Sequence, residues 1–313
     1  MYLRHLFVIA SLGWTSMAIA ESGLGSPTPI RFSALNELSG IVKSRRFEDV
    51  YWAHNDSGDQ PRLFALDGQG KIIFPRFLSR YFHGEEVEVG KQPWPGLPIA
   101  VAANVDWEDI AIGEDLLYVA DMGNNGNARR DLGVYVIVEP NPRAVELTRP
   151  LSFLPVRYPE QTEYPARRWH FDSEALFVAD GKLYFITKHR EAGKIDKFEL
   201  GAALYRLDTQ YTDRVNLLTR VDASDELAVA TGAEVSPDGR FLAVICYTDL
   251  WLFEKPSTDD KWLSSRAYRL PLPRRQVKQV EALTWVSNER LMIGNEEGEL
   301  YQIDRERVPL VAP

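Results

Sequence analysis

A degenerate repeat runs through the chain and constrains its fold more than any other feature. Each copy has a short apolar strand, a tight turn and a second apolar strand. The first strands are Leu38-Ser39-Gly40-Ile41, Trp107-Glu108-Asp109-Ile110, Ser173-Glu174-Ala175-Leu176, Gly232-Ala233-Glu234-Val235 and Val280-Glu281-Ala282-Leu283. Turn sequences such as Pro237-Asp238-Gly239-Arg240 follow, and a third apolar strand comes later in each copy. Short antiparallel strands repeated in units are typical of a β-propeller.

The repeats predict an all-β fold, a β-propeller with five blades. A sixth blade in the stretch 77–103 is the open alternative, but Gly90 and several prolines favour an insertion loop there. The segment Pro29 to Ala34 is expected to supply a strand that closes the ring and removes exposed sheet edges. A β-sandwich would not explain unit-length repetition. Residues 21–313 are therefore expected to form a single domain.

The first twenty residues contain the parts of a secretory signal peptide in order. Arg4 and His5 form a basic start, Leu6 to Trp14 is apolar, and Ala18-Ile19-Ala20 matches a cleavage site. A buried N-terminal helix is the alternative. We expect cleavage after Ala20 and a periplasmic or secreted mature protein without a membrane span.

Composition excludes several classes of function. The 313 residues include 36 Lys+Arg against 45 Asp+Glu, and a net charge of -9 argues against a nucleic-acid surface. The single cysteine, Cys246, cannot form an internal disulfide, and a zinc site built from several cysteines is excluded. The chain has no phosphate-binding loop, dinucleotide fingerprint, nucleophile elbow or zinc-protease motif, so no nucleotide or organic cofactor is expected.

Acidic residues begin several of the first strands. In an antiparallel blade, the start of the first strand and the end of the second lie at the same end, so these residues are expected at one mouth of a central channel. Carboxylates that converge there cannot all stay ionised without a cation, and oxygen ligands suit calcium, or magnesium with waters. The candidate metal ligands are Asp106, Glu108, Asp172, Glu174 and Glu281.

A structural role is the alternative for these acids. Each Glu could bond to the backbone of the neighbouring blade and fix blade docking, because buried polar groups need partners. Glu234 is shifted by one position against the others, and Gly40 occupies the matching place in the first copy. The acidic ring is therefore expected to be incomplete.

Polar residues that follow second strands are expected at the same mouth. The candidate ligand-binding residues are Asn55, Asp56, Asp121, Lys188, His189 and Asn295. Lys188-His189-Arg190 forms a basic cluster suited to a phosphate or a carboxylate. Turn formation and a solvated run of charge are the alternatives for these segments.

The motifs Trp107-Glu108-Asp109-Ile110, Ser173-Glu174-Ala175-Leu176, Thr231-Gly232-Ala233-Glu234 and Val280-Glu281-Ala282-Leu283 resemble the bacterial SdiA-regulated propeller family. Glu37-Leu38-Ser39-Gly40-Ile41, with Asn55-Asp56-Ser57-Gly58 after it, is similar to the related phytase-like (esterase-like) propellers. The resemblance spans roughly Leu35 to Ile303. It implies an exported protein with a channel acidic enough to bind calcium, and some phytase-like relatives are calcium-dependent phosphoester hydrolases.

These observations leave three functions open. The first is a propeller that binds a ligand or a periplasmic protein partner at the acidic mouth with a divalent cation. The second is a metal-dependent hydrolase of a phosphoester or lactone, in which Glu108 or Glu174 would act as the base. The third is an interaction scaffold without a small-molecule site. The sequence assigns no catalytic residue.

Overall fold

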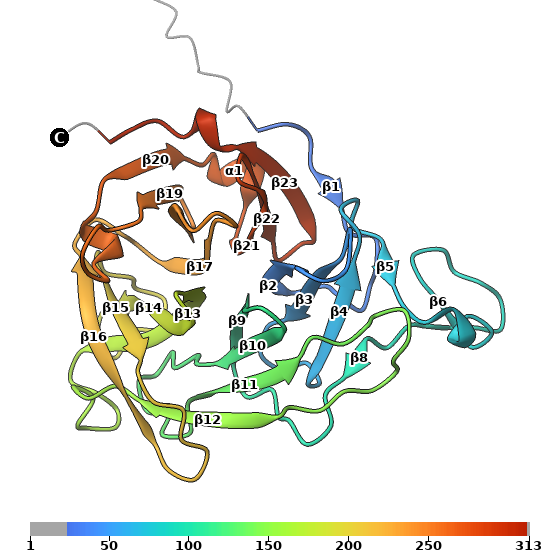
Figure 1. Cartoon of the computed structure of the whole chain (residues 1–313), viewed down its shortest axis with the longest axis horizontal. Helices are drawn as coiled ribbons and strands as arrows, with labels where there is room; N and C mark the ends of the chain where they lie inside the picture. The colour runs from blue at the N-terminus through green and yellow to red at the C-terminus, as the bar shows by residue number, and fades with distance from the viewer. Residues whose placement is uncertain (1–23, 312–313) are drawn as a thin grey trace, which may run out of the picture.

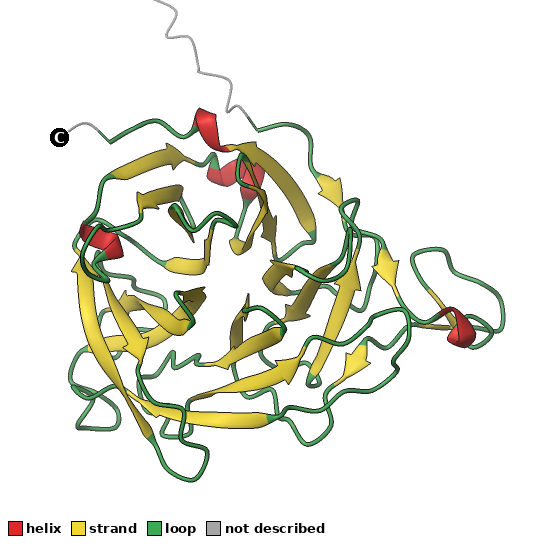
Figure 2. Ribbon diagram, viewed as in Figure 1, coloured by secondary structure: helices red, strands yellow, loops and turns green. Residues whose placement is uncertain are grey.

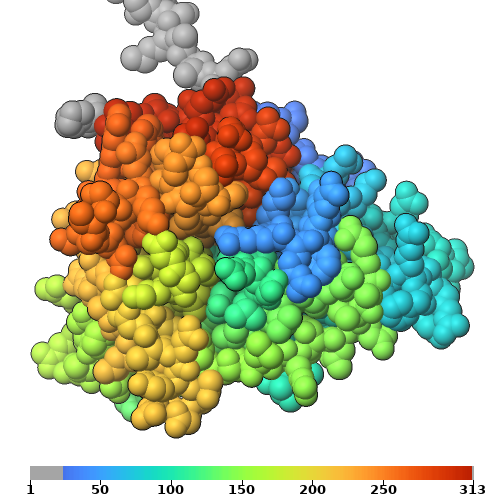
Figure 3. All heavy atoms as spheres, in the orientation of Figure 1, coloured from blue at the N-terminus to red at the C-terminus, as the bar shows by residue number. Residues whose placement is uncertain are grey.

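The structure is a computed structural model, and it describes residues 24–311. The predicted signal peptide lies outside the described residues. Five antiparallel sheets stand around a common axis (Figures 1 and 2), so the prediction of a five-bladed β-propeller is confirmed. In the space-filling view the blades follow one another around the molecule in chain order (Figure 3).

The strands of each blade are consecutive in the chain, apart from one. The first blade holds β2 (Leu38–Lys43), β3 (Tyr51–Asn55), β4 (Arg62–Leu66) and β5 (Ile72–Ile73); the second β9 (Trp107–Ile112), β10 (Leu116–Asp121), β11 (Gly133–Val138) and β12 (Ser152–Arg157); the third β13 (Trp169–Ala179), β14 (Lys182–Arg190), β15 (Ala202–Leu207) and β16 (Asn216–Ser224); the fourth β17 (Ala230–Val235), β18 (Phe241–Cys246), β19 (Asp249–Glu254) and β20 (Ala267–Pro271); the fifth β21 (Val280–Ser287), β22 (Arg290–Asn295), β23 (Glu299–Asp304) and β1 (Thr28–Pro29).

The N-terminal strand closes the ring. β1 pairs antiparallel with β23, so the first and last described segments share one blade (Figure 1). The strand ends at Pro29, earlier than the predicted segment, because Ile30 and Phe32 pack into the core beyond it. The outermost strands β12 and β16 also pair, in parallel, and join the second and third blades into one continuous sheet.

The stretch 77–103 adds no sixth blade to the described part of the chain. It holds the end of the short helix η1 (Arg76–Leu78), the parallel pair β6 (Phe82–His83) and β7 (Gln92–Pro93), and β8 (Leu97–Pro98). β8 adds to the edge of the first blade by pairing with β4, and the β6 segment projects from the ring (Figure 1).

The core lies between the blades. Five apolar clusters each join two neighbouring blades; one, for example, packs Phe177 and Tyr184 of the third blade against Trp251 and Phe253 of the fourth. Successive side chains of a strand point to opposite faces of the blade. Both faces of a blade therefore contact a neighbouring blade. The hairpin turn Asp180-Gly181 has positive φ at both residues, which matches the twist of the flanking strands.

Helices make a minor contribution. Apart from η1, they are α1 (Arg274–Val277), η2 (Trp262–Ser264) and η3 (Arg305–Arg307), which lie in the connections between or after strands (Figure 2). Within residues 24–311, no helix has the length and the hydropathy needed to span a bilayer.

Candidate metal and ligand site

Seven carboxylates from four blades gather where the innermost strands begin. We call them the acidic cluster: Asp56, Asp106, Glu108, Asp172, Glu174, Glu281 and Glu296. All five predicted metal ligands belong to it, together with Asp56 from the predicted ligand-binding set. Antiparallel register explains the convergence, because Asp172 pairs with Lys188 and Val280 with Asn295 across their hairpins.

The acidic cluster contains three groups of potential metal ligands. The groups are Asp56, Asp106 and Glu108; Asp56, Glu281 and Glu296; and Glu108, Asp172 and Glu174. In each group, oxygens from the three carboxylates lie within 4.8 Å of one another. Asp56 and Glu108 each belong to two groups, so they form the centre of the cluster.

Two buried cations neutralise only one side of the cluster. The Nζ of Lys188 forms an ion pair with Glu174 and lies 3.7 Å from Asp172, although the lysine is 2% exposed. The Nε of Arg190 donates to Asp172 at 3.2 Å. The ring of Phe198 covers both cations, with its centroid 5.6 Å from Lys188 Nζ and 4.5 Å from the Arg190 guanidinium carbon.

The other side of the cluster has no such compensation. Among the described residues, no lysine or arginine nitrogen lies within ion-pair distance of Asp56, Asp106, Glu108, Glu281 or Glu296. Tyr247 donates its hydroxyl to Glu281 at 3.0 Å, and Gln279 donates to Glu281 at 2.8 Å and also to Glu296. The fourth blade thus contributes a phenol where the other blades contribute acids.

The pKa values reflect burial and mutual repulsion. Burial, and then the charges of Asp172 and Asp56, raise the pKa of Asp106 to about 6. Burial, and then the charges of Glu281 and Asp56, raise the pKa of Glu296 to about 8. Burial raises the pKa of Glu108 well above its usual value, while the charge of Lys188 opposes this effect.

Gly123 explains how two of the acids fit. A Cβ at this position would lie 2.1 Å from Glu108 Oε1 and 2.3 Å from the Asp106 carboxyl carbon. Glycine therefore lets both carboxylates lie directly against the loop that follows β10. Gly123, Glu296 and Tyr247 are not among the predicted ligands, although Glu296 follows a second strand and Gly123 lies in a loop expected at the same mouth.

Three other predicted ligand-binding residues serve the scaffold. Asn55 accepts from the backbone N–H groups of Asn36 and Glu37 and donates to Ala34 and Asp59. Asn295 accepts from the Glu299 N–H and donates to the Val277 carbonyl. Asp121 binds Arg129 at 2.8 Å and accepts from the backbone of Asp106. The polar atoms of these side chains bond to other groups of the protein, and these bonds hold the loops beside the acidic cluster.

The predicted basic cluster is divided between two faces of β14. Lys188 and Arg190 face the carboxylates, whereas His189 between them lies against His170, with ring centroids 3.8 Å apart. Successive side chains of a strand alternate in direction, so the three residues cannot act on one ligand. The prediction that all three residues bind one phosphate or carboxylate is therefore wrong.

Two acids fulfil the structural alternative. Glu234 accepts from the Trp285 backbone N–H at 2.6 Å and from the Thr284 hydroxyl at 2.9 Å, which ties the fourth blade to the fifth. Asp109 accepts from the N–H groups of Leu176 and Ala233 in the third and fourth blades. Glu234 and Asp109 are each the third residue of their repeat motif, whereas Glu108 is the second. The position within the motif therefore separates acids that dock blades from acids of the cluster.

Comparison with known proteins finds no relative in sequence and only distant likeness to solved structures. No family profile matches the chain, and no curated protein matches it in sequence. Solved structures that resemble it include a luciferin-regenerating enzyme (TM-score 0.46, 11% identity, 93% of this chain and 80% of that one). Others are the glutaminyl cyclase of Myxococcus xanthus (0.45, 11%, 92% and 97%) and a putative 6-phosphogluconolactonase from Bacteroides uniformis (0.40, 14%, 87% and 69%). Likeness at this level says nothing about the activity of this chain.

The raised pKa of Glu296 leads to a prediction about stability and pH. A carboxyl whose folded-state pKa lies above its unfolded value stabilises the protein at low pH, and this contribution is lost as the pH rises through the folded-state pKa. In chelator, we expect the free energy of unfolding to fall by about 1 kcal/mol between pH 7 and 9, after allowance for solvent screening of this partly buried group. Denaturant unfolding checks this.

The matched variants for this test are Glu296→Gln and Glu297→Gln. Glu296→Gln should remove the loss, whereas Glu297→Gln, at an exposed neighbour, should retain it. His54 and His189 do not interfere, because burial lowers the pKa of His54 to about 4 and that of His189 to about 3, well below this range. An identical pH slope in wild type and Glu296→Gln would contradict the assignment of the repulsion to Glu296.

Proposed function

We propose that this chain is an exported β-propeller that binds a divalent cation, with calcium as the first choice, at the acidic cluster. The supporting observation is the uncompensated side of the cluster, where five carboxylates from three blades share space without a lysine or arginine partner. Carboxylate oxygens are hard ligands, and a calcium ion accepts six to eight of them in flexible geometry. A cation between Asp56, Asp106 and Glu108, or between Asp56, Glu281 and Glu296, would remove the repulsion.

A buried oxygen supports the same proposal. The Oε2 atom of Glu174 has no hydrogen-bond partner among the described residues, and Glu174 is 6% exposed. A buried, unpaired carboxylate oxygen is costly unless something binds it. Glu174 and Glu108 belong to one ligand group, so a cation or the ligand that it recruits would occupy this position.

Calcium binding should stabilise the folded protein. A ligand that binds only the folded state at a hundred times its dissociation constant adds about 2.7 kcal/mol, which corresponds to a rise of about 5 °C in Tm for a chain of this length. We expect this rise in millimolar calcium relative to chelator, and its loss in Asp56→Asn. The control Glu297→Gln should behave as wild type. Equal Tm values in calcium and chelator for the wild type would contradict the proposal.

A metal-dependent hydrolase of phosphoesters or lactones is the second candidate, and Glu296 favours it. Without a cation, burial and the charges of Glu281 and Asp56 raise the pKa of its partly buried carboxyl to about 8. A cation held by Asp56, Asp106 and Glu108 would leave Glu296 outside its ligand set, as a neighbouring acid. A carboxylic acid of this kind next to a Lewis acid has the properties of a general acid. Glu296 suits the role better than Glu108 or Glu174, because both are buried and Glu174 is paired with Lys188.

The hydrolase candidate is tested with phosphoesters and lactones in millimolar calcium. Turnover that falls at least about a hundredfold in Glu296→Gln, with calcium affinity retained, would support it. Turnover that is equal in wild type and variant, or absent in both, would leave binding as the function.

We also propose membership of the SdiA-regulated, phytase-like propellers. The support is the set of repeat motifs together with the acidic cluster, which lies where those motifs begin. The signal-like sequence of residues 1–20 supports export to the periplasm or beyond. A ligand or a periplasmic protein would dock at the cluster, beside the partly exposed Asp56.

A further inference from the structure

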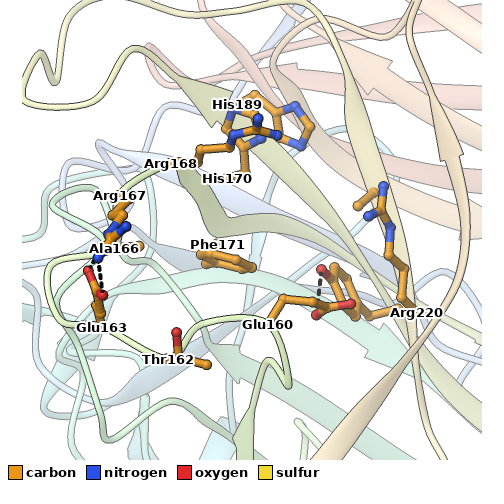
Figure 4. Close-up of a pocket in the computed structure, with 12 residues that line it drawn as sticks. Glu160, Thr162, Glu163, Ala166, Arg167, Arg168, His170, Phe171, His189 and Arg220 are labelled. Carbon is orange, nitrogen blue, oxygen red and sulfur yellow. Dashed lines mark hydrogen bonds and ion pairs between the residues drawn. The ribbon is translucent and has the colours of Figure 1, made fainter.

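A pocket whose lining includes no residue of the acidic cluster holds the stacked rings of His170 and His189 (Figure 4). Its volume is about 480 Å³, within the range of sites for small molecules. The side chains that form it include Arg168, His170, Phe171, His189, Tyr205 and Arg220. His189 reaches this pocket because it alternates with Lys188 and Arg190 along the strand.

A buried imidazole with a free nitrogen lines the pocket. His189 is 9% exposed, and its Nε2 has no hydrogen-bond partner among the described residues. Its ring stacks on His170, with an angle of 5° between the planes. Burial is the largest cause that lowers the pKa of His189, to about 3, so the ring is neutral at physiological pH. A neutral imidazole nitrogen at this depth needs a polar partner, and a bound ligand would supply one.

Two arginines at the pocket are available to an anion. The side chains of Arg168 and Arg220 form no hydrogen bond or ion pair with any residue in the range 24–311. Arg167, by contrast, is occupied by Glu163 at 2.9 Å. A free guanidinium matches a carboxylate or phosphate group with two parallel hydrogen bonds.

Aromatic rings form a wall of the same pocket. Phe171 and Tyr205 both pack on the buried Tyr158, at centroid distances of 5.4 and 4.8 Å, so their positions are fixed. Tyr205 also donates to Glu160 at 3.2 Å. A flat ring gains by stacking on such a surface.

We infer that this pocket is a second binding site, independent of the cation, for a small organic anion that carries a flat ring. Arg168 and Arg220 hold the carboxylate or phosphate group, the ring packs against Phe171 and Tyr205, and a polar atom on the ring contacts His189 Nε2. The shared chemistry is an aromatic anion, whether its charge is a carboxylate or a phosphate.

Calorimetric titration in chelator tests this inference. The probes are 2-naphthoate, a nucleoside monophosphate, and two controls that lack one feature each, cyclohexanecarboxylate and 2-naphthamide. We expect saturable binding of at least one aromatic anion, and binding at least about tenfold weaker for both controls. The probe that binds identifies the charged group as carboxylate or phosphate.

Variants assign the binding to the pocket. Arg168→Gln and Arg220→Gln should each weaken binding by about tenfold, because each removes a charge-assisted pair. Arg214→Gln, an exposed arginine whose partner is Asp213, should have no effect, and Asp56→Asn should bind normally because the cation site is separate. The inference is overturned if neither aromatic anion binds at millimolar concentration, if cyclohexanecarboxylate binds equally well, or if both arginine variants retain wild-type affinity.

Discussion

Replacing Lys188 by methionine is expected to lower the free energy of unfolding by about 3–5 kcal/mol at neutral pH. Lys188 is 2% exposed and pairs with Glu174. Burial raises the pKa values of Asp56, Glu108 and Glu281, and the charge of Lys188 opposes this rise. Methionine fills a similar volume but leaves Arg190 as the only described cation within ion-pair distance of Asp172 and Glu174. The cost is that of an uncompensated buried charge.

A double variant separates charge from packing. Lys188→Met with Glu174→Gln removes both partners of the pair, so it should recover most of the lost stability in chelator. Denaturant unfolding of the four proteins of this cycle measures the coupling. If Lys188→Met lies within 1 kcal/mol of the wild type, or if the double variant is no more stable than the single one, Lys188 is not the counter-ion of the cluster.

The second large effect is expected at Asp109. Its carboxylate accepts from the N–H groups of Ile110 at 2.8 Å, Leu176 at 2.7 Å and Ala233 at 3.3 Å, and so ties three blades together. Asp109→Ala leaves buried donors without partners, which costs about 1–3 kcal/mol for each, so a loss of about 3 kcal/mol or more is expected.

Hydrogen exchange adds a local measurement to this prediction. The amides of Leu176 and Ala233 should exchange faster in Asp109→Ala than those of strands outside the contact. Asp115→Ala, at an exposed aspartate, is the control and should lose less than about 0.5 kcal/mol. Unchanged exchange at Leu176 would show that Asp109 does not dock the blades.

The fold could be predicted from the sequence because the same pattern occurs five times. A strand such as Leu117–Ala120 is ambiguous alone, but the repeated order of strand, turn and strand defines the blade and its number. Ring closure followed from the need to cover an edge strand. The parallel pair of β12 and β16 could not be predicted, because it depends on how two outer edges meet in space.

The candidate site was predictable where it depends on strand register. Asp106, Glu108, Asp172, Glu174 and Glu281 share a position at the start of their strands, and the structure brings them together. Loop residues were less predictable, because Asn55 and Asn295 look like ligands in sequence but are occupied by backbone groups in the fold. His189 was misplaced because the basic run was considered as a unit rather than as alternating side chains.

Calcium titration by calorimetry tests the central claim most directly. At neutral pH, the wild-type protein should bind calcium saturably, and Asp56→Asn, which removes a ligand shared by two of the three groups, should weaken binding by about tenfold or more. Glu297→Gln, next to the cluster, should bind as the wild type does. If the wild type takes up no calcium, or if Asp56→Asn binds it with unchanged affinity, the acidic cluster is not a cation site.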